Sequence, residues 1–305
     1  MRAVLFDDFG GPEVLRVESI EIPSPGPGQI RLLVRTAGVN PVDGKIRSGA
    51  MEAMFPTPLP AIPGIDVAGI VDALGEGVTG VAPGDEVLGW ADTGSYAEYA
   101  LATRFASKPA GLSWEAAVTL PVAGTTALRV LRLLDLAAGE TLLVHGAAGA
   151  IGTLAVQLAV KGGATVIGTA SAANQDYVAE LGATPTRYGD GLLERVRALA
   201  PNGVDAVFDV AGKGALPASI ELRGGTDRIV TIADPAAREL GVQFSAGGPD
   251  PRASADLAEL ATLAARGELR TAVAATYPLQ EAATAQGLSD AGHVRGKLVL
   301  TVGAG

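Results

Sequence analysis

The sequence predicts an α/β protein in which a β-rich domain accompanies a doubly wound parallel sheet. Short alternating segments separated by glycine and proline turns fill the first hundred residues. A glycine turn then follows a buried strand near residue 145, and strands alternate with helices from there onward. A chain of 305 residues suits two domains better than one, and it is long enough to bury large cores.

A glycine turn at residues 146–152 is the centre of the predicted sheet domain. It follows the apolar strand 141–145 and leads into the apolar helix 151–161. Its glycines are Gly146, Gly149 and Gly152, a spacing that differs from the G-x-G-x-x-G fingerprint. Because a helix begins with unpaired N–H groups and partial positive charge, the turn predicts a pyrophosphate site for a dinucleotide.

The β-rich part is predicted from period-two alternation of apolar and polar residues. Residues 24–28 read Ser-Pro-Gly-Pro-Gly and form a turn, because proline fixes φ and glycine permits positive φ. The predicted strands are 2–6, 15–22 with a shift of phase, 30–36, 67–74, 86–90 and 96–101.

The parallel sheet is predicted from the alternation of strands and helices after residue 141. Ser113 is expected to cap a helix that Pro121 interrupts. The predicted strands are 141–145, 165–169, 204–210, 228–232 and 242–245, and the helices are 151–161, 175–181, 192–199 and 216–222. An amphipathic helix at 253–266 and a strand–helix–strand tail at 272–275, 280–288 and 297–302 follow; the tail could return to the first domain.

Composition excludes several classes of function. A net charge of −10 argues against a nucleic-acid partner, because phosphate backbones need a basic surface. The absence of cysteine excludes disulfides and thiolate metal sites, and two histidines give little basis for a histidine site, so we expect no metal. We see no signal peptide and no apolar run approaching a membrane span of about 20 residues, and we expect a cytoplasmic protein without a membrane partner.

The region after the second strand of the sheet bears on the choice of cofactor. NAD sites place an acidic residue about 20 positions after the glycine turn, where it binds the ribose diol. Here residues 168–174 contain no Asp or Glu, and Ser171 stands in this region. A hydroxyl tolerates a 2′-phosphate that a carboxylate would repel, and Arg187 and Tyr188 could add a cation and a stacking face. The pattern favours NADPH over NADH; the alternative is that Ser171 merely caps the next helix.

Several motifs along the whole chain carry a resemblance to a known family. They are Ala-Gly-Val-Asn-Pro-Val-Asp at 37–43, Ile-Pro-Gly-Ile-Asp-Val-Ala-Gly at 62–69, Gly-Asp-Glu-Val at 84–87, His-Gly-Ala-Ala-Gly at 145–149 and Arg-Gly-Lys-Leu-Val-Leu at 295–300. With these motifs the chain resembles the zinc-independent quinone oxidoreductase, or zeta-crystallin-like, branch of the medium-chain dehydrogenase/reductase superfamily.

The resemblance implies a GroES-like catalytic domain, residues 1–115 and 268–305, around a Rossmann nucleotide-binding domain, residues 116–267. Zinc-dependent relatives carry a cysteine at the position of Asn40 and a Gly-His-Glu segment where this chain has Gly64, Ile65 and Asp66. Zinc-assisted alcohol dehydrogenation is therefore poorly supported.

The resemblance also implies site residues. Asn40 matches a residue at the nicotinamide end of the site, and Lys297 matches a basic residue close to the cofactor. At the position of Lys45, several relatives have a tyrosine. Lys45 could donate a proton or be an exposed surface charge. The remaining expected cofactor contacts are Thr126, Gly146, Gly149, Ala150, Ile151, Ser171, Arg187, Tyr188, Val210, Ala211, Ile232 and Ala233.

The implied reaction is hydride transfer from NADPH to a quinone or to an α,β-unsaturated carbonyl compound. One alternative is a trans-acting enoyl-thioester reductase with Arg47, Lys45 and Arg104 at a basic entrance; another is a non-catalytic NADPH-binding protein. The resemblance further allows a homodimer through the edge strand 242–245. His145 is expected to be structural, and Asp66 to anchor backbone.

Overall fold

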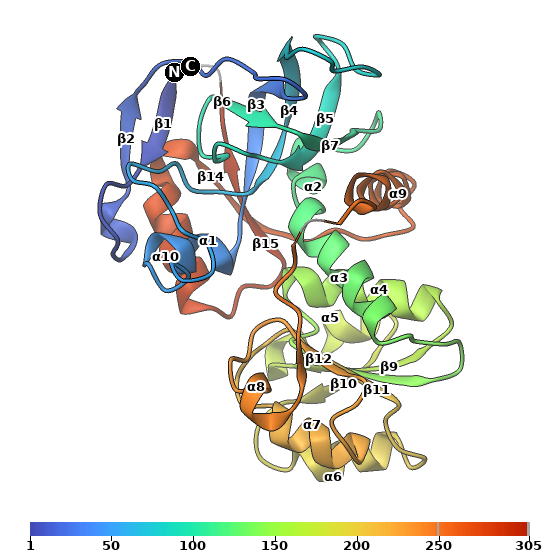
Figure 1. The fold of residues 1–305 in the computed structure, drawn as a ribbon. Helices are drawn as coiled ribbons and strands as arrows, with labels where there is room; N and C mark the ends of the chain where they lie inside the picture. The colour runs from blue at the N-terminus through green and yellow to red at the C-terminus, as the bar shows by residue number, and fades with distance from the viewer. Residues whose placement is uncertain (249, 304–305) are drawn as a thin grey trace. The chain divides into compact units, whose positions relative to one another are not determined.

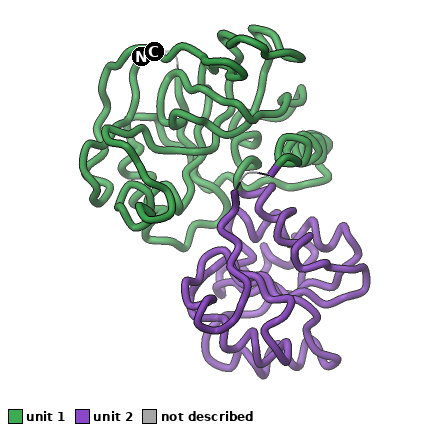
Figure 2. Tube along the Cα trace, in the orientation of Figure 1, with its two compact units in different colours: residues 1–122, 251–305 green, residues 123–250 purple. Residues whose placement is uncertain are grey.

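The computed structural model describes residues 1–248 and 250–303, which form two compact units (Figures 1 and 2). Unit 1 comprises Met1–Val122 and Pro251–Gly305, and unit 2 comprises Ala123–Asp250. These bounds differ from the predicted ones mainly at α9 (Ala253–Ala265), which belongs to unit 1 and packs on β7 (Arg104–Ser107). Periodicity reveals the apolar face of such a helix but not the surface that covers it.

Unit 1 is built on a mixed sheet in which the tail of the chain pairs with its beginning. The order is β14-β15-β3-β4-β5-β7, with β6 also paired to β3. β15 (Lys297–Thr301) lies antiparallel to β3 (Ile30–Val39) and parallel to β14 (Val273–Pro278). The tail therefore does return to the first domain. The other strands are β4 (Asp66–Leu74), β5 (Glu86–Trp90) and β6 (Tyr99–Ala102).

The alternation read from the sequence sets the core of unit 1. Along β3, Ile30, Leu32 and Val34 are buried, whereas Arg31 and Arg35 are half-buried. α10 (Ala282–Ala291) covers this core with Ala282 and Ala285. A smaller antiparallel pair, β1 (Arg2–Leu5) and β2 (Arg16–Ser19), lies beside a single turn, η1 (Pro12–Val14).

One helix of unit 1 was not predicted. α1 (Pro41–Arg47) begins directly after β3, with Asn40 at the N-cap and Pro41 in the first turn. The Asp43 carboxylate accepts the Asn40 backbone N–H at 2.8 Å, which satisfies a donor at the start of the helix. Gly44 obscures the helical pattern in the sequence. It is small because α10 approaches closely: a Cβ on Gly44 would lie 2.2 Å from the Asp290 carboxylate.

Unit 2 is a doubly wound parallel sheet, as predicted. The strand order is β10-β9-β8-β11-β12-β13 and every pair is parallel, so the order reverses between β8 and β11. The strands are β8 (Thr141–His145), β9 (Thr165–Ala170), β10 (Thr184–Arg187), β11 (Ala206–Asp209), β12 (Ile229–Thr231) and β13 (Gln243–Phe244).

Helices connect these strands and cover the sheet. One apolar cluster joins Leu143, Ile167 and Val207 of the strands to Val196 and Leu216 of two helices. These are α6 (Leu192–Leu199) and α7 (Leu216–Arg223), which lie along the same face of the sheet in Figure 1. The other helices are α3 (Pro121–Leu133), α4 (Ala150–Lys161), α5 (Gln175–Glu180), α8 (Ala237–Leu240) and the single turn η2 (Ala172–Asn174).

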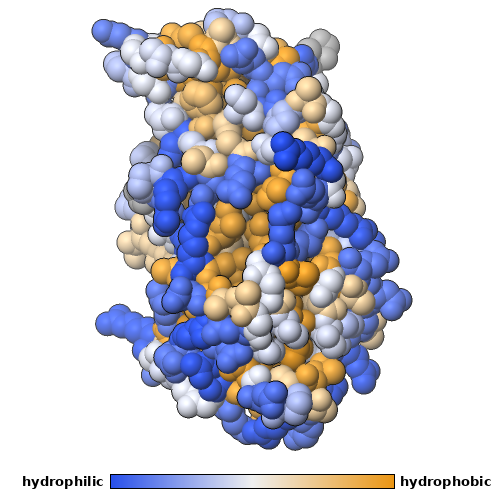
Figure 3. Space-filling model, turned by 90° about the vertical axis from the view of Figure 1, so that its right-hand side faces the viewer, coloured by the Kyte–Doolittle hydropathy of each residue, from blue (hydrophilic) through white to orange (hydrophobic). Residues whose placement is uncertain are grey.

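One apolar stretch reaches the length of a membrane span, which the sequence reading did not anticipate. Trp114–Leu133 includes α2 (Trp114–Ala117) and α3, has a hydropathy of 1.2 and is 50% buried inside the protein. A half-buried core helix passes the same test, so this stretch is weak evidence for a span. Figure 3 shows hydrophilic and hydrophobic residues interspersed over one face of the protein.

Candidate functional site

The residues expected to bind the cofactor follow the strands of unit 2 where each strand ends. Gly146 follows β8, Ser171 follows β9, Tyr188 follows β10, Val210 follows β11 and Ile232 follows β12. Because all these strands are parallel, their carboxyl ends meet at one edge, the usual ligand-binding edge of an open α/β sheet. The structure therefore brings together residues that are spread over 88 positions of the sequence, from 146 to 233.

The three glycines of the turn have different local environments. Gly146 has φ +80°, a conformation that other residues rarely adopt. A Cβ on Gly152 would lie 2.2 Å from the Gly146 carbonyl oxygen, so Gly152 is required for close packing of helix on turn. A Cβ on Gly149 would meet nothing closer than 3.5 Å. The space beside Gly149 is therefore open to another group.

Gly149 is also the N-cap of α4, a helix of 12 residues. Thr153 donates its N–H to the Gly149 carbonyl, and the preceding N–H groups of the first turn, those of Ala150 and Ile151 among them, have no acceptor within the helix. Side chains do not cap this end. The open space at Gly149, the free donors and the helix dipole fit a pyrophosphate.

His145 is a hydrogen-bonded core residue, as expected. Its Nε2 lies 3.0 Å from the Ser219 hydroxyl and its Nδ1 lies 3.4 Å from the Thr169 hydroxyl. Burial disfavours the charged ring and lowers the pKa of His145 to about 4, although the Asp209 carboxylate opposes this shift. The ring is therefore neutral at pH 7.

A buried pair that the sequence reading missed shapes two of the loops at the sheet edge. The Asp209 carboxylate accepts the N–H groups of Ala211 and Gly212 at 3.0 and 3.1 Å and the Thr231 hydroxyl at 2.8 Å. The Thr231 oxygen in turn accepts the N–H of Ala233 at 3.1 Å. Asp209 and Thr231 thus hold the loops that carry Val210–Ala211 and Ile232–Ala233. The only signal in the sequence was a carboxylate at the end of an apolar strand.

Ser171 and Tyr188 lie on adjacent strand ends, because Arg187 of β10 is in register with Ala170 of β9. Ser171 is the N-cap of η2, and its hydroxyl accepts the Asn174 side-chain amide at 3.1 Å rather than a backbone N–H. Arg187 is exposed, and Tyr188 is 53% exposed. Both side chains are therefore accessible to a ligand. Thr126 lies instead on α3 and is half-buried.

Unit 1 brings Asn40 and Lys297 together around Asp66. The Asn40 amide donates to the Asp66 carboxylate at 2.9 Å, and its oxygen accepts the Lys297 ammonium at 2.5 Å. Lys297 also pairs with Asp66. The other Asp66 oxygen accepts the Val122 N–H at 2.8 Å, so Asp66 anchors backbone as expected and binds a cation as well. All three side chains are at most 5% exposed.

A second buried carboxylate, Asp43, adjoins this network. It accepts the Tyr96 hydroxyl at 3.3 Å, and its other oxygen has no hydrogen-bond partner. Burial raises the pKa of Asp43 to about 7, against the lowering effect of the Asn40 backbone N–H. Asp43 was not singled out as a site residue in the sequence, where it is only the last residue of the 37–43 motif.

The two cations of α1 differ in accessibility. Lys45 is exposed, which agrees with the surface-charge alternative but does not test its role in catalysis. Arg47 is 2% exposed and donates to the Gly10 carbonyl at 3.1 Å, to Asp290 at 2.7 Å and to Gln286. The hydrogen bonds of Arg47 thus link α1 to α10.

The position at which zinc-dependent proteins place ligands does not fit a metal ion here. Both Asp66 oxygens already accept hydrogen bonds, and a metal ion would have to displace the Lys297 ammonium. Over residues 1–248 and 250–303, no group of three or more His, Cys, Asp or Glu side chains is placed to hold a metal.

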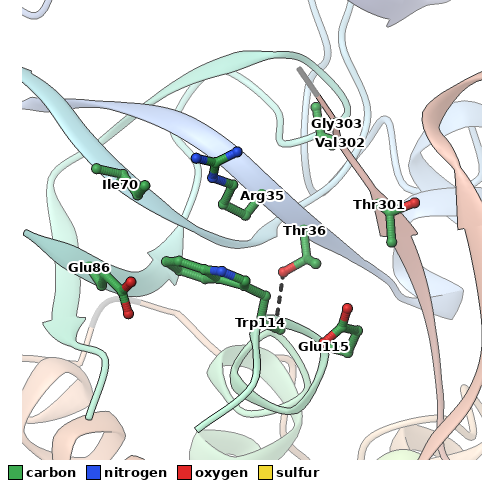
Figure 4. Close-up of a pocket in the computed structure, with 9 residues that line it drawn as sticks. All are labelled: Arg35, Thr36, Ile70, Glu86, Trp114, Glu115, Thr301, Val302 and Gly303. Atoms are coloured by element: carbon green, nitrogen blue, oxygen red, sulfur yellow. Dashed lines mark hydrogen bonds between the residues drawn. The ribbon is translucent and has the colours of Figure 1, made fainter. Parts of the chain in front are cut away.

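A surface hollow of about 350 Å³ lies elsewhere in unit 1 and contains none of the predicted site residues (Figure 4). At its floor the Thr36 hydroxyl donates to the Trp114 carbonyl at 3.0 Å. The hollow is lined by Arg35, Thr36, Ile70, Glu86, Trp114, Glu115, Thr301, Val302 and Gly303.

A mixed β domain combined with a doubly wound nucleotide-binding sheet defines a medium-chain dehydrogenase/reductase. Residues 26–115 match the alcohol dehydrogenase GroES-like domain, and residues 181–300 match the domain described as zinc-binding dehydrogenase. The chain is 34% identical over 321 residues to a quinone oxidoreductase of Sus scrofa, covering 97% of this chain and 95% of that protein. The chain therefore belongs to the quinone oxidoreductases of this superfamily, which use a pyridine nucleotide cofactor.

Solved structures agree with this assignment. A quinone oxidoreductase from Coxiella burnetii matches with a TM-score of 0.86 and 32% identity, over 99% of each chain. A mycobacterial protein solved in complex with NADPH matches with a TM-score of 0.87 and 28% identity, over 99% of this chain and 100% of that one. An NADPH-dependent alkenal/one oxidoreductase of Arabidopsis thaliana is 37% identical over 226 residues, covering 70% of this chain and 58% of that protein.

Proposed function

We propose that this oxidoreductase is a zinc-independent reductase that uses NADPH and reduces quinones or α,β-unsaturated carbonyl compounds. The observation that carries the proposal is the edge of the unit 2 sheet. There an open glycine turn at a helix N-terminus lies in line with strand ends that bear Ser171 and Tyr188 and no carboxylate at the Ser171 position.

The preference for NADPH rests on these residues and not on the names of relatives. The comparisons include a protein named as NADPH-dependent and also a structure named as an NAD-dependent alcohol dehydrogenase, which is 30% identical with a TM-score of 0.87. A hydroxyl at Ser171 accommodates a 2′-phosphate, and the exposed Arg187 supplies a cation for it. An acidic residue at position 171 would instead have favoured NADH.

When bound, the nicotinamide supplies the hydride. The protein's part is orientation and electrostatics. The Gly149 turn and the first N–H groups of α4 would bind the pyrophosphate, and the loops after β11 and β12, held by Asp209 and Thr231, would support the nicotinamide. Asn40 and Lys297, whose side chains are held together within unit 1, are proposed as further cofactor contacts. The proton comes from solvent or from Lys45.

One alternative is a trans-acting enoyl-thioester reductase, and one comparison favours it. The chain is 35% identical over 302 residues to part of a pikromycin polyketide synthase component of Streptomyces venezuelae. Arg47, however, is buried and bonded to the Gly10 carbonyl and to Gln286 and Asp290 of α10. Arg104 is exposed and lies 5.1 Å from the centre of the Trp90 ring. The basic entrance that this alternative requires is thus reduced to Lys45 and Arg104.

The test is a turnover assay in which NADPH and NADH are each combined with quinones, enones and an enoyl thioester. We expect NADPH consumption with quinones or enones and much weaker consumption with the thioester. Thioester turnover as fast as quinone turnover would favour the alternative. NADPH binding without consumption by any acceptor would show a non-catalytic binding protein and would contradict the reductase proposal.

We also propose a cytoplasmic homodimer with small-molecule partners and no nucleic-acid or membrane partner. The edge strand β13 supports the dimer, because Gln243 and Phe244 are both exposed on it and it pairs with only one neighbour, β12. Light scattering of the wild type and of Phe244→Lys tests this interface. A wild type that is monomeric at micromolar concentration would contradict it.

A further inference from the structure

Arg195 is a half-buried arginine of α6 whose side chain turns back onto the loop that follows β10. Its guanidinium donates to the carbonyl oxygens of Arg187 and Asp190, each at 2.7 Å, and to that of Gly189 at 3.5 Å. The Nε atom is buried without a partner. One side chain therefore hydrogen-bonds to three carbonyl oxygens of the four-residue loop 187–190.

The carbonyl groups of the loop are thus bonded, whereas its backbone N–H groups are not. Gly189 and Gly191 have φ +85° and +74°, so the chain turns here through conformations that suit glycine. Across the described residues, the N–H groups of Tyr188, Gly189 and Asp190 have no hydrogen-bond acceptor. Successive free N–H groups in such a turn form an anion-binding concavity.

The loop adjoins the residues expected to recognise the ribose of the cofactor. Arg187 is paired in register with Ala170, so Tyr188 and Ser171 are the next residues on adjacent strand ends. Arg187 and Tyr188 are exposed, and Arg195 adds a second cation directly behind the loop. Asp190 is the one exposed carboxylate in the loop, and its backbone carbonyl is held by Arg195.

We infer that Arg195 is a positioning residue for the 2′-phosphate of NADPH: by holding the loop carbonyls it presents the N–H groups and the side chains of Arg187 and Tyr188 to the phosphate. This inference rests on the proposed preference for NADPH. It requires Arg195 to act through the loop rather than through contact with the cofactor.

The experiment compares Arg195→Met with Arg197→Met as a matched control. Arg197 lies on the same helix, and its side chain is 55% exposed and pairs with Glu221. Arg197→Met therefore removes the same charge as Arg195→Met but none of the contacts with the loop. Dissociation constants for NADPH and NADH are measured for the wild type and both variants. The amide chemical shifts of residues 188–190 are measured in parallel by NMR.

We expect Arg195→Met to weaken NADPH binding about tenfold, because the loop no longer holds its groups toward the phosphate, with NADH binding unchanged. The amide chemical shifts of residues 188–190 should change, because the loop carbonyls lose their partner, and Arg197→Met should resemble the wild type. An unchanged NADPH:NADH ratio in Arg195→Met, beside a wild type that prefers NADPH, would overturn the inference while the proposed function stands. A wild type without preference would overturn the proposed cofactor choice. Weaker NADPH binding with unchanged amide shifts in the loop would show that Arg195 does not act through the loop.

Discussion

The two units place their charged groups in opposite ways. In unit 1, Asp66, Lys297 and Arg47 are at most 2% exposed and are bonded to one another or to neighbouring elements. At the sheet edge of unit 2 the buried polar residues, Asp209 and Thr231, are bonded within the fold, whereas the cation Arg187 is exposed. Charge in unit 1 stabilises a fixed arrangement, and charge in unit 2 is available to an anionic ligand.

The largest expected effect tests the fixed arrangement in unit 1. Lys297→Met leaves the Asp66 carboxylate buried without its cation, and breaking a buried pair costs about 3–5 kcal/mol. Both tryptophans, Trp90 and Trp114, lie in unit 1, so their fluorescence during urea unfolding measures this loss.

The matched control is Lys45→Met, which removes an exposed lysine from the same unit and should leave the transition unchanged. The double variant Asp66→Asn/Lys297→Met removes the unpaired charge and should be more stable than Lys297→Met alone. A stability of Lys297→Met equal to that of the wild type would show that the pair does not hold unit 1 together.

The next effect tests the accessible edge of unit 2 with two glycine substitutions. Gly152→Ala forces a Cβ against the Gly146 carbonyl and should destabilise unit 2 by about 1–3 kcal/mol. Gly149→Ala meets no close atom of the protein and should leave stability unchanged, yet it should weaken cofactor binding at least about tenfold if the pyrophosphate lies against Gly149. Circular dichroism and cofactor titration measure the two effects. Full cofactor affinity in Gly149→Ala would remove the turn from the binding site.

A third prediction concerns pH, to which the two units should respond in opposite directions. Asp43 ordinarily has a pKa of 3.8, and in the fold its pKa is about 7, so the folded state holds the extra proton between these values. Unit 1 is therefore fully stabilised by Asp43 below about pH 4 and loses that stability as the pH rises through 7. His145 has its pKa lowered from 6.5 to about 4, so unit 2 loses stability as the pH falls through this range.

Each group contributes a slope of at most about 1.4 kcal/mol per pH unit. Unfolding followed by tryptophan fluorescence between pH 4 and pH 7.5 should show a decline in the wild type that Asp43→Asn reduces. Asp8→Asn, the same substitution at an exposed position of unit 1, is the control. A pH profile of Asp43→Asn identical to that of the wild type would show that Asp43 titrates normally.

The smallest effect is expected for Lys45→Ala. An exposed lysine contributes about 0.5 kcal/mol or less to stability, so unfolding should not change. We expect turnover within about threefold of the wild type, since loss of a positioned proton donor would cost about a hundredfold or more. A loss of that size in kcat would instead establish Lys45 as the donor.

The sequence predicted what depends on local periodicity and on turn chemistry. The strands Glu86–Trp90 and Thr141–His145 and the helix Leu192–Leu199 have the predicted bounds, because apolar runs there are flanked by glycine, proline or charged residues. The glycine turn was found for the same reason. α1 escaped detection because Pro41 and Gly44 weaken its helical signal, and its stability comes from α10, more than 230 positions away in the chain.

Contacts between segments far apart in the chain could not be predicted from the sequence, for a physical reason. Nothing near Asp66 in the sequence shows that Lys297 will neutralise it, and nothing near Tyr188 shows that Arg195 will gather the loop carbonyls. Such partners are set by strand order and by register. The roles of Asn40 and Lys297 in the reaction stay predictions, although their contact is now defined.

The pairing of β15 with β3 has a consequence for how the chain folds during its synthesis. Unit 2 is encoded between the two segments of unit 1, so during synthesis its sheet can form while the sheet of unit 1 still lacks β14 and β15. Until residue 297 emerges, Asp66 has no cation and the edge of β3 that later pairs with β15 is open. β15 therefore both completes the pairing of β3 and neutralises the buried carboxylate, and before it is made this edge of unit 1 is open to non-native pairing.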